Sequence, residues 1–302
     1  MLPLTLITSC QKADPNQPKA TDSPSSNVYY DNVIIQKDVV YGYDDSTQQI
    51  MDIYLQGQFT GEPNWVEVDK SPKNTLVFIH GGGWLGGDKA DNPFVLADYL
   101  EKGWVVFSLN YRMGPGTAPN AAEDVICAMR WIADRKDDYG VDVNNIFTTG
   151  SSAGGHLSLV AGLAPTSQKD YVCDISDIPV KGIINYYGIT EISQNEAFLN
   201  KEKPQWNYTI TWIGERDRID GVSKKYSPVY MASRNAPPVI TIHGAVDSVV
   251  PYTQATLLEA RLEELGILHK LVTIEDGNHG GFRDQGYERV NKEVFDFIES
   301  LD

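Results

Sequence analysis

The sequence has few basic residues, few cysteines and no visible internal repeat. Lysine and arginine number 25 against 41 aspartates and glutamates, which gives a formal net charge of −16. So acidic a chain is a poor partner for nucleic acid or an anionic membrane surface, and we expect no nucleic-acid partner. No H-E-x-x-H motif and no cluster of cysteine and histidine is present, so we expect no metal site and no cofactor.

The chain is long enough to build one large α/β core. Its 302 residues are 41% hydrophobic. Strand patterns alternate with helical patterns, of which residues 121–134, 253–265 and 288–301 are examples. This alternation predicts an α/β fold with a mostly parallel, twisted sheet and helices on both of its faces.

A G-x-S-x-G pattern lies at residues 150–154, which read Gly-Ser-Ser-Ala-Gly. A short apolar strand pattern at 145–149 precedes it, and an apolar helical pattern at 156–161 follows it. The glycines allow a turn too tight for side chains, which would lift the Ser152 hydroxyl above the end of the sheet. Two glycines around a serine also make an ordinary turn, but the flanking strand and helix favour a nucleophile elbow with Ser152 as nucleophile.

A second glycine-rich motif follows an earlier strand pattern. Residues 75–79 are apolar and lead into His-Gly-Gly-Gly-Trp at residues 80–84. Acyl transfer passes through a tetrahedral oxyanion, which needs hydrogen-bond donors fixed in advance. We assign this role to the backbone N–H groups of Gly82 and Gly83, together with that of Ala153 from the elbow. We interpret His80 as structural, holding the loop by hydrogen bonds.

The same glycines formally match the dinucleotide fingerprint G-x-G-x-x-G at Gly81, Gly83 and Gly86. That fingerprint opens a helix directly and is followed by an acidic residue at the end of the next strand. Here Trp84 interrupts the glycines, and the next helical pattern starts only near residue 92. The next strand pattern, 104–109, runs into Asn-Tyr-Arg. Nucleotide binding is therefore disfavoured.

Two later loops supply an acid and a base in the order that follows a nucleophile elbow. Asp247 follows the strand pattern 238–242, and His279 follows the strand pattern 269–274. We predict His279 as the general base and Asp247 as the carboxylate that fixes its tautomer. Glu275 and Asp276 are rivals for the acid, but they lie on the loop of His279 itself. The other histidines of the chain, His156, His243 and His269, fit structural positions better.

These motifs together resemble the α/β-hydrolase esterases. More narrowly, they are similar to the hormone-sensitive-lipase-like group and its bacterial feruloyl or acetyl-xylan esterase branch. The resemblance covers about residues 38–300, and residues 39–55 are similar to the first hairpin of that branch. It implies an α/β-hydrolase fold, with nucleophile, acid and base at Ser152, Asp247 and His279. Tyr111 and Arg112 could also reach the site, although the resemblance implies that such a pair mainly supports the loop of the oxyanion hole. Ser151 departs from the lipase-like pattern, which usually has Asp there.

The segment 188–233 interrupts the rhythm of strands and helices and is rich in aromatic residues. An insertion at this point forms a short lid or pocket wall at the carboxyl end of the sheet in many such folds. We therefore name Trp206 and Trp212 from this segment, with Trp84, as candidates for substrate contact. The competing interpretation, equally supported, is that the aromatics of the segment pack a small core of their own.

The first residues resemble a targeting signal. Residues 7–10 read Ile-Thr-Ser-Cys, which resembles a bacterial lipobox with Cys10 as the lipidated residue. We therefore divide the chain into a leader remnant and flexible linker, 1–27, and a catalytic domain, 28–302. A merely frayed terminus is the alternative. Cys127 and Cys173 could form one disulfide in an oxidising compartment, and free buried thiols are the other possibility.

The sequence thus predicts a serine carboxylic-ester hydrolase outside the cytoplasm, with a small-molecule or polysaccharide ester as substrate and a possible membrane tether through Cys10. Acetyl or feruloyl groups on carbohydrate are the favoured targets. A general short-chain carboxylesterase or a peptidase of the same fold is the alternative among enzymes. A non-catalytic surface lipoprotein that binds glycans is the alternative of another class. The sequence does not determine the oligomeric state.

Overall fold

The computed structural model describes residues 27–30, 33–44, 47–59, 66–91, 93–167, 169–194, 207–280, 282 and 284–302. Cys10 and the leader lie outside the described residues, as does nearly all of the linker. Trp206 also lies outside them, together with the middle of the segment 188–233.

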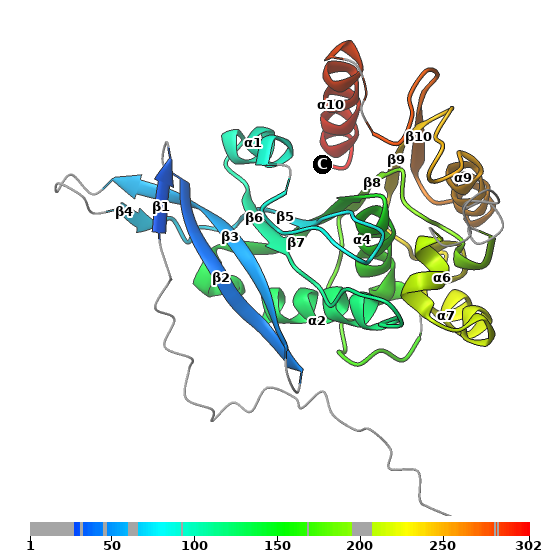
Figure 1. The fold of residues 1–302 in the computed structure, drawn as a ribbon. Helices are drawn as coiled ribbons and strands as arrows, with labels where there is room; N and C mark the ends of the chain where they lie inside the picture. Colours follow the sequence, from blue (N-terminus) through cyan, green and yellow to red (C-terminus); the bar gives the residue numbers. More distant parts are fainter. Residues whose placement is uncertain are drawn as a thin grey trace, which may run out of the picture.

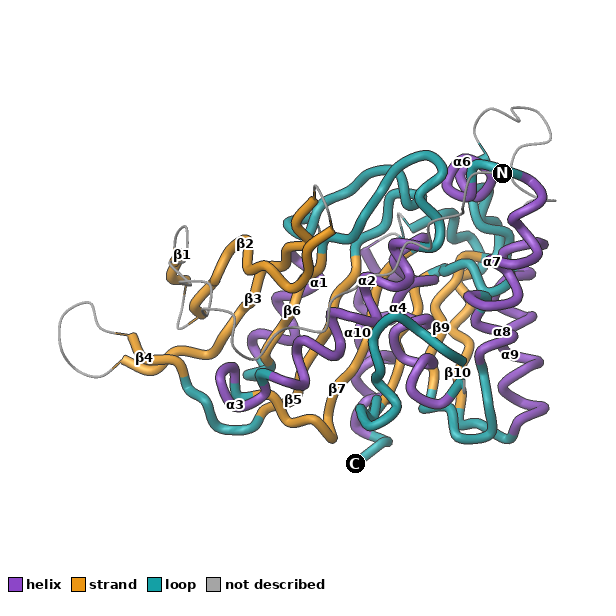
Figure 2. Tube along the Cα trace, turned by 90° about the horizontal axis from the view of Figure 1, so that it is seen from below, coloured by secondary structure: helices purple, strands orange, loops and turns teal. Residues whose placement is uncertain are grey.

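One mixed sheet runs through the described part of the chain, as Figure 2 shows from β1–β4 on one side to β9 and β10 on the other. Its order is β1-β2-β3-β6-β5-β7-β8-β9-β10, and β4 pairs with β3. The strands from β6 to β10 in this order are parallel neighbours, and the pairs among β1–β4 are antiparallel, as is β3 with β6. The strands are β1 (Asn27–Tyr30), β2 (Val33–Asp44), β3 (Thr47–Phe59), β4 (Val66–Val68), β5 (Lys73–Ile79), β6 (Val105–Leu109), β7 (Val141–Ser151), β8 (Gly182–Tyr186), β9 (Val239–Gly244) and β10 (His269–Ile274).

Helices cover both faces of this sheet, as the alternating pattern predicted (Figure 1). On one face lie α1 (Pro93–Glu101) and α10 (Asp284–Glu299), whose apolar side chains form one buried cluster with the sheet. On the other face lie α2 (Asn120–Asp134), α4 (Ala153–Leu163) and α9 (Thr253–Leu265) in a second cluster. Helix α10 begins before the predicted start at residue 288, because Gly286 and its polar neighbours hide the helical pattern.

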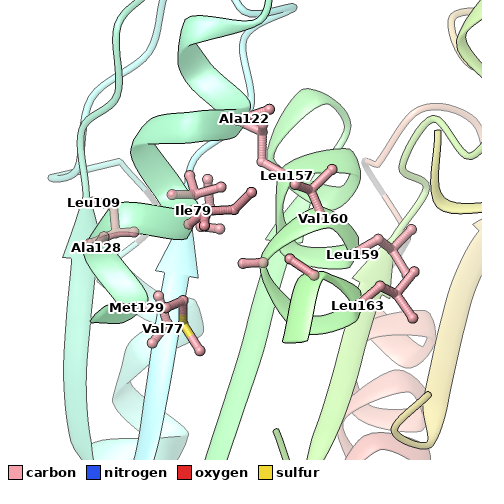
Figure 3. Close-up of a cluster of buried hydrophobic side chains, with 14 of the residues drawn as sticks. Val77, Ile79, Leu109, Ala122, Ala128, Met129, Leu157, Leu159, Val160 and Leu163 are labelled. Atoms are coloured by element: carbon pink, nitrogen blue, oxygen red, sulfur yellow. The ribbon is translucent and has the colours of Figure 1, made fainter. Parts of the chain in front are cut away.

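The second cluster fixes the helix that carries the elbow. Every residue of α4 is buried, which explains why its sequence is apolar on all sides. Figure 3 shows Leu157 of α4 beside Ala122 of α2, and Val77 of β5 beside Met129 of α2, with Ile79 of β5 in the same cluster. Burying each of these large side chains contributes about 1.5–3 kcal/mol, so α4 is held firmly on the sheet.

The described part of the segment 188–233 forms α6 (Tyr208–Ile213), the 3₁₀ turn Arg216–Arg218, α7 (Ile219–Tyr226) and α8 (Pro228–Met231). The loop 114–118 donates backbone hydrogen bonds to the end of α6, from Gly116 to Thr211 over 2.9 Å and from Ala118 to Trp212 over 3.1 Å. Helix α8 packs against α4 and α9. These helices are therefore part of the body of the domain. Within the described residues, no helix has both the length and the apolar character needed to cross a bilayer.

A disulfide joins Cys127 of α2 to Cys173, 46 residues further along the chain. Of the two alternatives left open by the sequence, the structure has the disulfide. Nearby on α2, the buried carboxylate of Glu123 accepts hydrogen bonds from the backbone N–H of Val172 and from the Tyr226 hydroxyl. The disulfide and Glu123 thus attach the loop before β8 to α2.

Candidate active site

Ser152 occupies a tight turn between β7 and α4. Its φ of 58° and ψ of −121° are unusual for a residue with a side chain, and such strain gathers at functional sites. Gly150 and Gly154 must be glycines because neighbouring backbone atoms come too close to leave room for a Cβ. A Cβ at Gly150 would lie 2.4 Å from the carbonyl oxygen of Gly154, and one at Gly154 would lie 2.1 Å from that of Ile79. This geometry accounts for the G-x-S-x-G pattern in physical terms.

Three of the predicted site residues come together above the carboxyl ends of neighbouring parallel strands. His279, on the loop after β10, places Nε2 3.0 Å from Oγ of Ser152. Its Nδ1 donates a hydrogen bond of 2.8 Å to Oδ2 of Asp247, on the loop after β9. With Nδ1 as donor, Nε2 of the neutral imidazole is free to accept the Ser152 proton.

The side chain of Asp247 is buried and receives hydrogen bonds from several sides. Its Oδ1 accepts from the backbone N–H groups of Val249 and Val250, each over 2.8 Å. Nε2 of His243 lies 3.4 Å from Oδ2. Burial alone raises the pKa of Asp247, but the hydrogen bonds from His243, His279 and Val249 outweigh burial and hold the pKa well below its usual range. The carboxylate is therefore charged in the folded protein near neutral pH.

The two rival acids are elsewhere. Glu275 and Asp276 are exposed at the start of the loop of His279. Among the described residues, Asp247 provides the carboxylate that is hydrogen-bonded to His279.

The glycine loop, residues 80–87, follows β5 and lies against the elbow. A Cβ at Gly81 would be 3.6 Å from Cβ of Ser152. Gly82 and Gly83 have φ of 113° and 61°, values that favour glycine. In the described part of the chain, no group accepts a hydrogen bond from either N–H, and the N–H of Ala153 opens α4 without an intrahelical partner. Three backbone donors thus lie on the two segments that meet at Ser152.

Side chains behind the glycine loop hold it in place. His80 is buried, its Nδ1 donates to the carbonyl oxygen of Gly81 over 2.7 Å, and its ring stacks on that of Tyr111. The Tyr111 hydroxyl donates to the carbonyl oxygen of His80 over 3.1 Å. Arg112 pairs with the carboxylate of Asp124 on α2. The structural role predicted for His80, and the supporting role implied for the Tyr–Arg pair, agree with these contacts.

The proposed substrate contacts of Trp84 and Trp212 are wrong. Their exposed fractions are 1% and 0%, and the two indoles stack on each other with centroids 4.5 Å apart. Nε1 of Trp84 donates to Nδ1 of His156, a histidine whose other nitrogen donates to the carbonyl oxygen of Tyr226. These aromatics pack a core between the glycine loop, α4 and α6. Trp206, the third candidate, lies outside the described residues.

Two tyrosines that were not singled out as site residues lie beside the glycine loop and His279. A Cβ at Gly83 would be 2.6 Å from Cδ1 of Tyr208, so that ring packs directly on the glycine loop. The ring of Tyr187 lies against that of His279, with centroids 4.7 Å apart. Tyr187 directly follows a strand, so its place at the carboxyl edge could have been noticed; its contact with His279 could not.

No group of three or more potential metal ligands occurs among the described residues.

The strand order and the solved structures with the same fold define an α/β-hydrolase fold. Residues 64–262, more than half of the chain, match the BD-FAE family, and the chain belongs to that family.

Named relatives are esterases. The chain is 29% identical to Esterase LipC of Mycobacterium tuberculosis over 250 residues, which are 81% of this chain and 59% of LipC. It is 32% identical to the probable carboxylic ester hydrolase LipM of the same organism over 186 residues, 60% of this chain and 42% of LipM. The chain thus spans about half the length of the curated relatives it matches.

Solved structures agree on the fold. A truncated carbohydrate esterase from gut microbiota superposes with a TM-score of 0.69 at 24% identity, covering 93% of this chain and 98% of that one. Esterase 2 of Thermogutta terrifontis with bound propionate gives a TM-score of 0.67 at 22% identity, covering 88% and 94%. At such identities the likeness concerns the fold.

Proposed function

We propose that the protein is a serine carboxylic-ester hydrolase that works through an acyl-enzyme. The observation that carries the proposal is the continuous hydrogen-bonded chain from Ser152 through His279 to Asp247. His279 takes the Ser152 proton as Oγ attacks the ester carbonyl, and Asp247 holds the imidazole in the tautomer that can accept it.

The backbone N–H groups of Gly82, Gly83 and Ala153 would stabilise the oxyanion that forms on the carbonyl oxygen. The tetrahedral intermediate collapses as His279 returns the proton to the leaving alcohol, which leaves the acyl group on Ser152. Water, deprotonated by His279, then attacks the acyl carbonyl, and the acid leaves as Ser152 regains its proton.

Labelling with a fluorophosphonate probe tests this chemistry. We expect one equivalent on the wild type and none on Ser152→Ala. A wild type that does not label would instead support the non-catalytic, glycan-binding alternative.

For the substrate, we propose acetyl or hydroxycinnamoyl esters of carbohydrate. Membership of the BD-FAE family and the likeness to a carbohydrate esterase support this class. The described part of the segment 188–233 also carries charged, exposed side chains such as Glu215, Arg216 and Asp217, which suit a polar substrate better than a fat.

The measurement is a panel of acetylated xylan, methyl ferulate and p-nitrophenyl esters of increasing length. Efficient cleavage of the first two, with little cleavage of acyl chains longer than about eight carbons, is expected. Rates on the palmitate equal to those on the acetate would contradict the proposal.

A general short-chain carboxylesterase is the second candidate. The named relatives LipC and LipM and the propionate-bound structure of the Thermogutta esterase favour it. It predicts rapid hydrolysis of simple acetate, propionate and butyrate esters with no preference for a sugar alcohol. The ratio of kcat/KM on acetylated xylan to that on p-nitrophenyl acetate separates the two candidates.

We also propose that the protein works outside the cytoplasm, tethered through a lipidated Cys10. The lipobox-like residues 7–10 and the disulfide between Cys127 and Cys173 support this location, since disulfides persist in oxidising compartments. Metabolic labelling with a radioactive fatty acid tests it. We expect label on the expressed wild type and none on Cys10→Ala.

A further inference from the structure

The ring of Tyr187 is the nearest aromatic neighbour of His279 among the described residues, with centroids 4.7 Å apart and planes at 62°. Tyr187 directly follows β8 and has a φ of 40°, a left-handed value that is costly for a residue with a bulky side chain. The surrounding structure must therefore hold it there. The backbone does so in part, since the N–H of Tyr187 donates to the carbonyl oxygen of Ile242 in β9 over 2.8 Å.

The Tyr187 side chain reaches from the base to the elbow. Its hydroxyl lies near the side chain of Ser151, the residue before the nucleophile: burial raises the pKa of Tyr187, and Ser151 lowers it in part. On the other side, a Cβ at Gly280 would lie 2.9 Å from the same hydroxyl oxygen, so the backbone after His279 passes directly over the end of the ring. One side chain thus contacts the segment of the nucleophile and the segment of the base.

His279 needs such a neighbour for a geometric reason. Its two ring nitrogens are each hydrogen-bonded, one to Asp247 and one to Ser152. These two hydrogen bonds and the covalent bond to Cβ limit the tilt of the ring only as far as the loop that carries His279 is itself held. A ring packed against the imidazole at a steep angle blocks that tilt. The loop of His279 is held at Asn278, whose Oδ1 accepts hydrogen bonds from the backbone N–H groups of Ser248 and His279, but these bonds hold the backbone and not the ring.

We propose that Tyr187 is a positioning residue, whose ring holds the imidazole of His279 in the orientation that reaches Ser152. This inference rests on the proposed esterase function.

The test uses variants that separate the effects of the aromatic ring, the hydroxyl group and the strained backbone of Tyr187. Tyr187→Gly removes the ring and relieves the left-handed φ, whereas Tyr187→Phe keeps the ring and removes the hydroxyl. We expect kcat on p-nitrophenyl acetate to fall about ten- to hundredfold in the glycine variant, since displacements near 1 Å cost this much, with KM changed less than about threefold. The phenylalanine variant should stay within about threefold of the wild type.

Tyr139→Ala is the matched control, because Tyr139 is a buried aromatic of the short helix α3 (Lys136–Tyr139) that packs on Phe107 and Trp131 instead. It should lose stability and keep kcat. A glycine variant with kcat within twofold of the wild type, or with a changed KM at unchanged kcat, overturns the inference.

A second readout does not depend on turnover. In protein with ¹⁵N-labelled histidine, the Nδ1 proton of His279 bonded to Asp247 should give a downfield NMR signal. We expect this signal in the wild type and in Tyr187→Phe, and its loss or broadening in Tyr187→Gly. If the wild type hydrolyses no ester, the proposed function fails while this signal still decides the inference; an unchanged signal in the glycine variant overturns it.

Discussion

Trp84 and His156 are joined by a hydrogen bond of 3.3 Å from Nε1 of the indole to Nδ1 of the imidazole. The bond connects the glycine loop to the helix that starts at the elbow. A single buried hydrogen bond therefore links the two segments that carry the donors of the proposed oxyanion hole. An indole N–H can only donate, which makes Nδ1 of His156 an acceptor. Its Nε2 donates to the carbonyl oxygen of Tyr226 over 2.9 Å, and the ring is therefore neutral.

Lowering the pH should reduce the free energy of unfolding, because His156 takes up a proton more readily in the unfolded chain than in the folded protein. Burial lowers the pKa of His156 from 6.5 to about 4. As pH falls from 6.5 to 4, the unfolded chain takes up a proton that the folded state resists. Stability that is fully present above pH 6.5 is then lost, by about 3 kcal/mol across this window. Urea unfolding at several pH values should show a weaker pH dependence for His156→Gln than for the wild type.

His269→Gln, which replaces a partly exposed histidine of β10, is the substitution control for this measurement. Parallel curves for the wild type and His156→Gln would show that His156 does not cause the loss.

The register of the elbow can be tested on two adjacent serines. Ser152→Ala should lower kcat by several orders of magnitude with the fold intact, because the triad acts as a unit. Ser151→Ala should cost far less, since the hydrogen bond of His279 goes to the Ser152 hydroxyl. Steady-state rates and circular dichroism of both variants decide the matter. If Ser151→Ala were the inactive one, the nucleophile would be misassigned.

The acid can be tested against its rivals. Asp247→Asn should keep the shape of the site and favour the wrong tautomer of His279, with a loss in kcat of up to about 10⁴. Glu275→Gln and Asp276→Asn, both exposed, should remain within about threefold of the wild type. Severe loss in either of those two, with an active Asp247→Asn, would reassign the acid.

The glycine loop offers a test of close packing. At Gly83, φ is 61° and a Cβ would lie 2.6 Å from Cδ1 and 2.8 Å from Cγ of Tyr208, near the fixed end of that side chain. Gly83→Ala should therefore shift the loop and lower kcat/KM by about ten- to hundredfold. Gly86→Ala is the matched control, because nothing lies within 4 Å of its Cβ. Equal rates for the two variants would argue against a role for the backbone at Gly83.

The disulfide should contribute to stability and not to chemistry. Closing a segment of 46 residues restricts the unfolded chain, so the double variant Cys127→Ser, Cys173→Ser should lose about 2–4 kcal/mol of unfolding free energy. Its kcat well below the melting temperature should match the wild type. Urea titrations with and without reductant measure the effect, and the reduced wild type should behave like the double variant.

The elements that position the site could be predicted because their signals are local. The apolar runs of β5, β7 and β9 are largely buried within a parallel sheet, and each is followed by the motif that lies at its carboxyl end. The edge strand β10 is only partly buried, and the loop of His279 follows it. The roles of Ser152, Asp247 and His279 as nucleophile, acid and base then follow from their order along the chain. Gly150 and Gly154 are part of the G-x-S-x-G pattern, which predicts a tight turn. The structure explains the pattern, since only glycine tolerates the close backbone atoms at both positions.

What could not be predicted depends on contacts between distant segments. Trp84 and Trp212 are 128 positions apart, and nothing in their neighbours shows that they stack and exclude each other from solvent. The pairing of Cys127 with Cys173 likewise depends on where the loop before β8 crosses α2. The contact of Tyr187 with His279 requires a left-handed tyrosine, which no pattern of residue types indicates.

The stacked indoles of Trp84 and Trp212 also give the protein a built-in optical reporter. Two parallel chromophores at 4.5 Å couple electronically, and the asymmetry of their fixed arrangement generates a signal in the near-ultraviolet circular dichroism. One chromophore belongs to the glycine loop and the other to α6. Any rearrangement of one relative to the other, during inhibition or acylation, would change the spectrum without a label being attached.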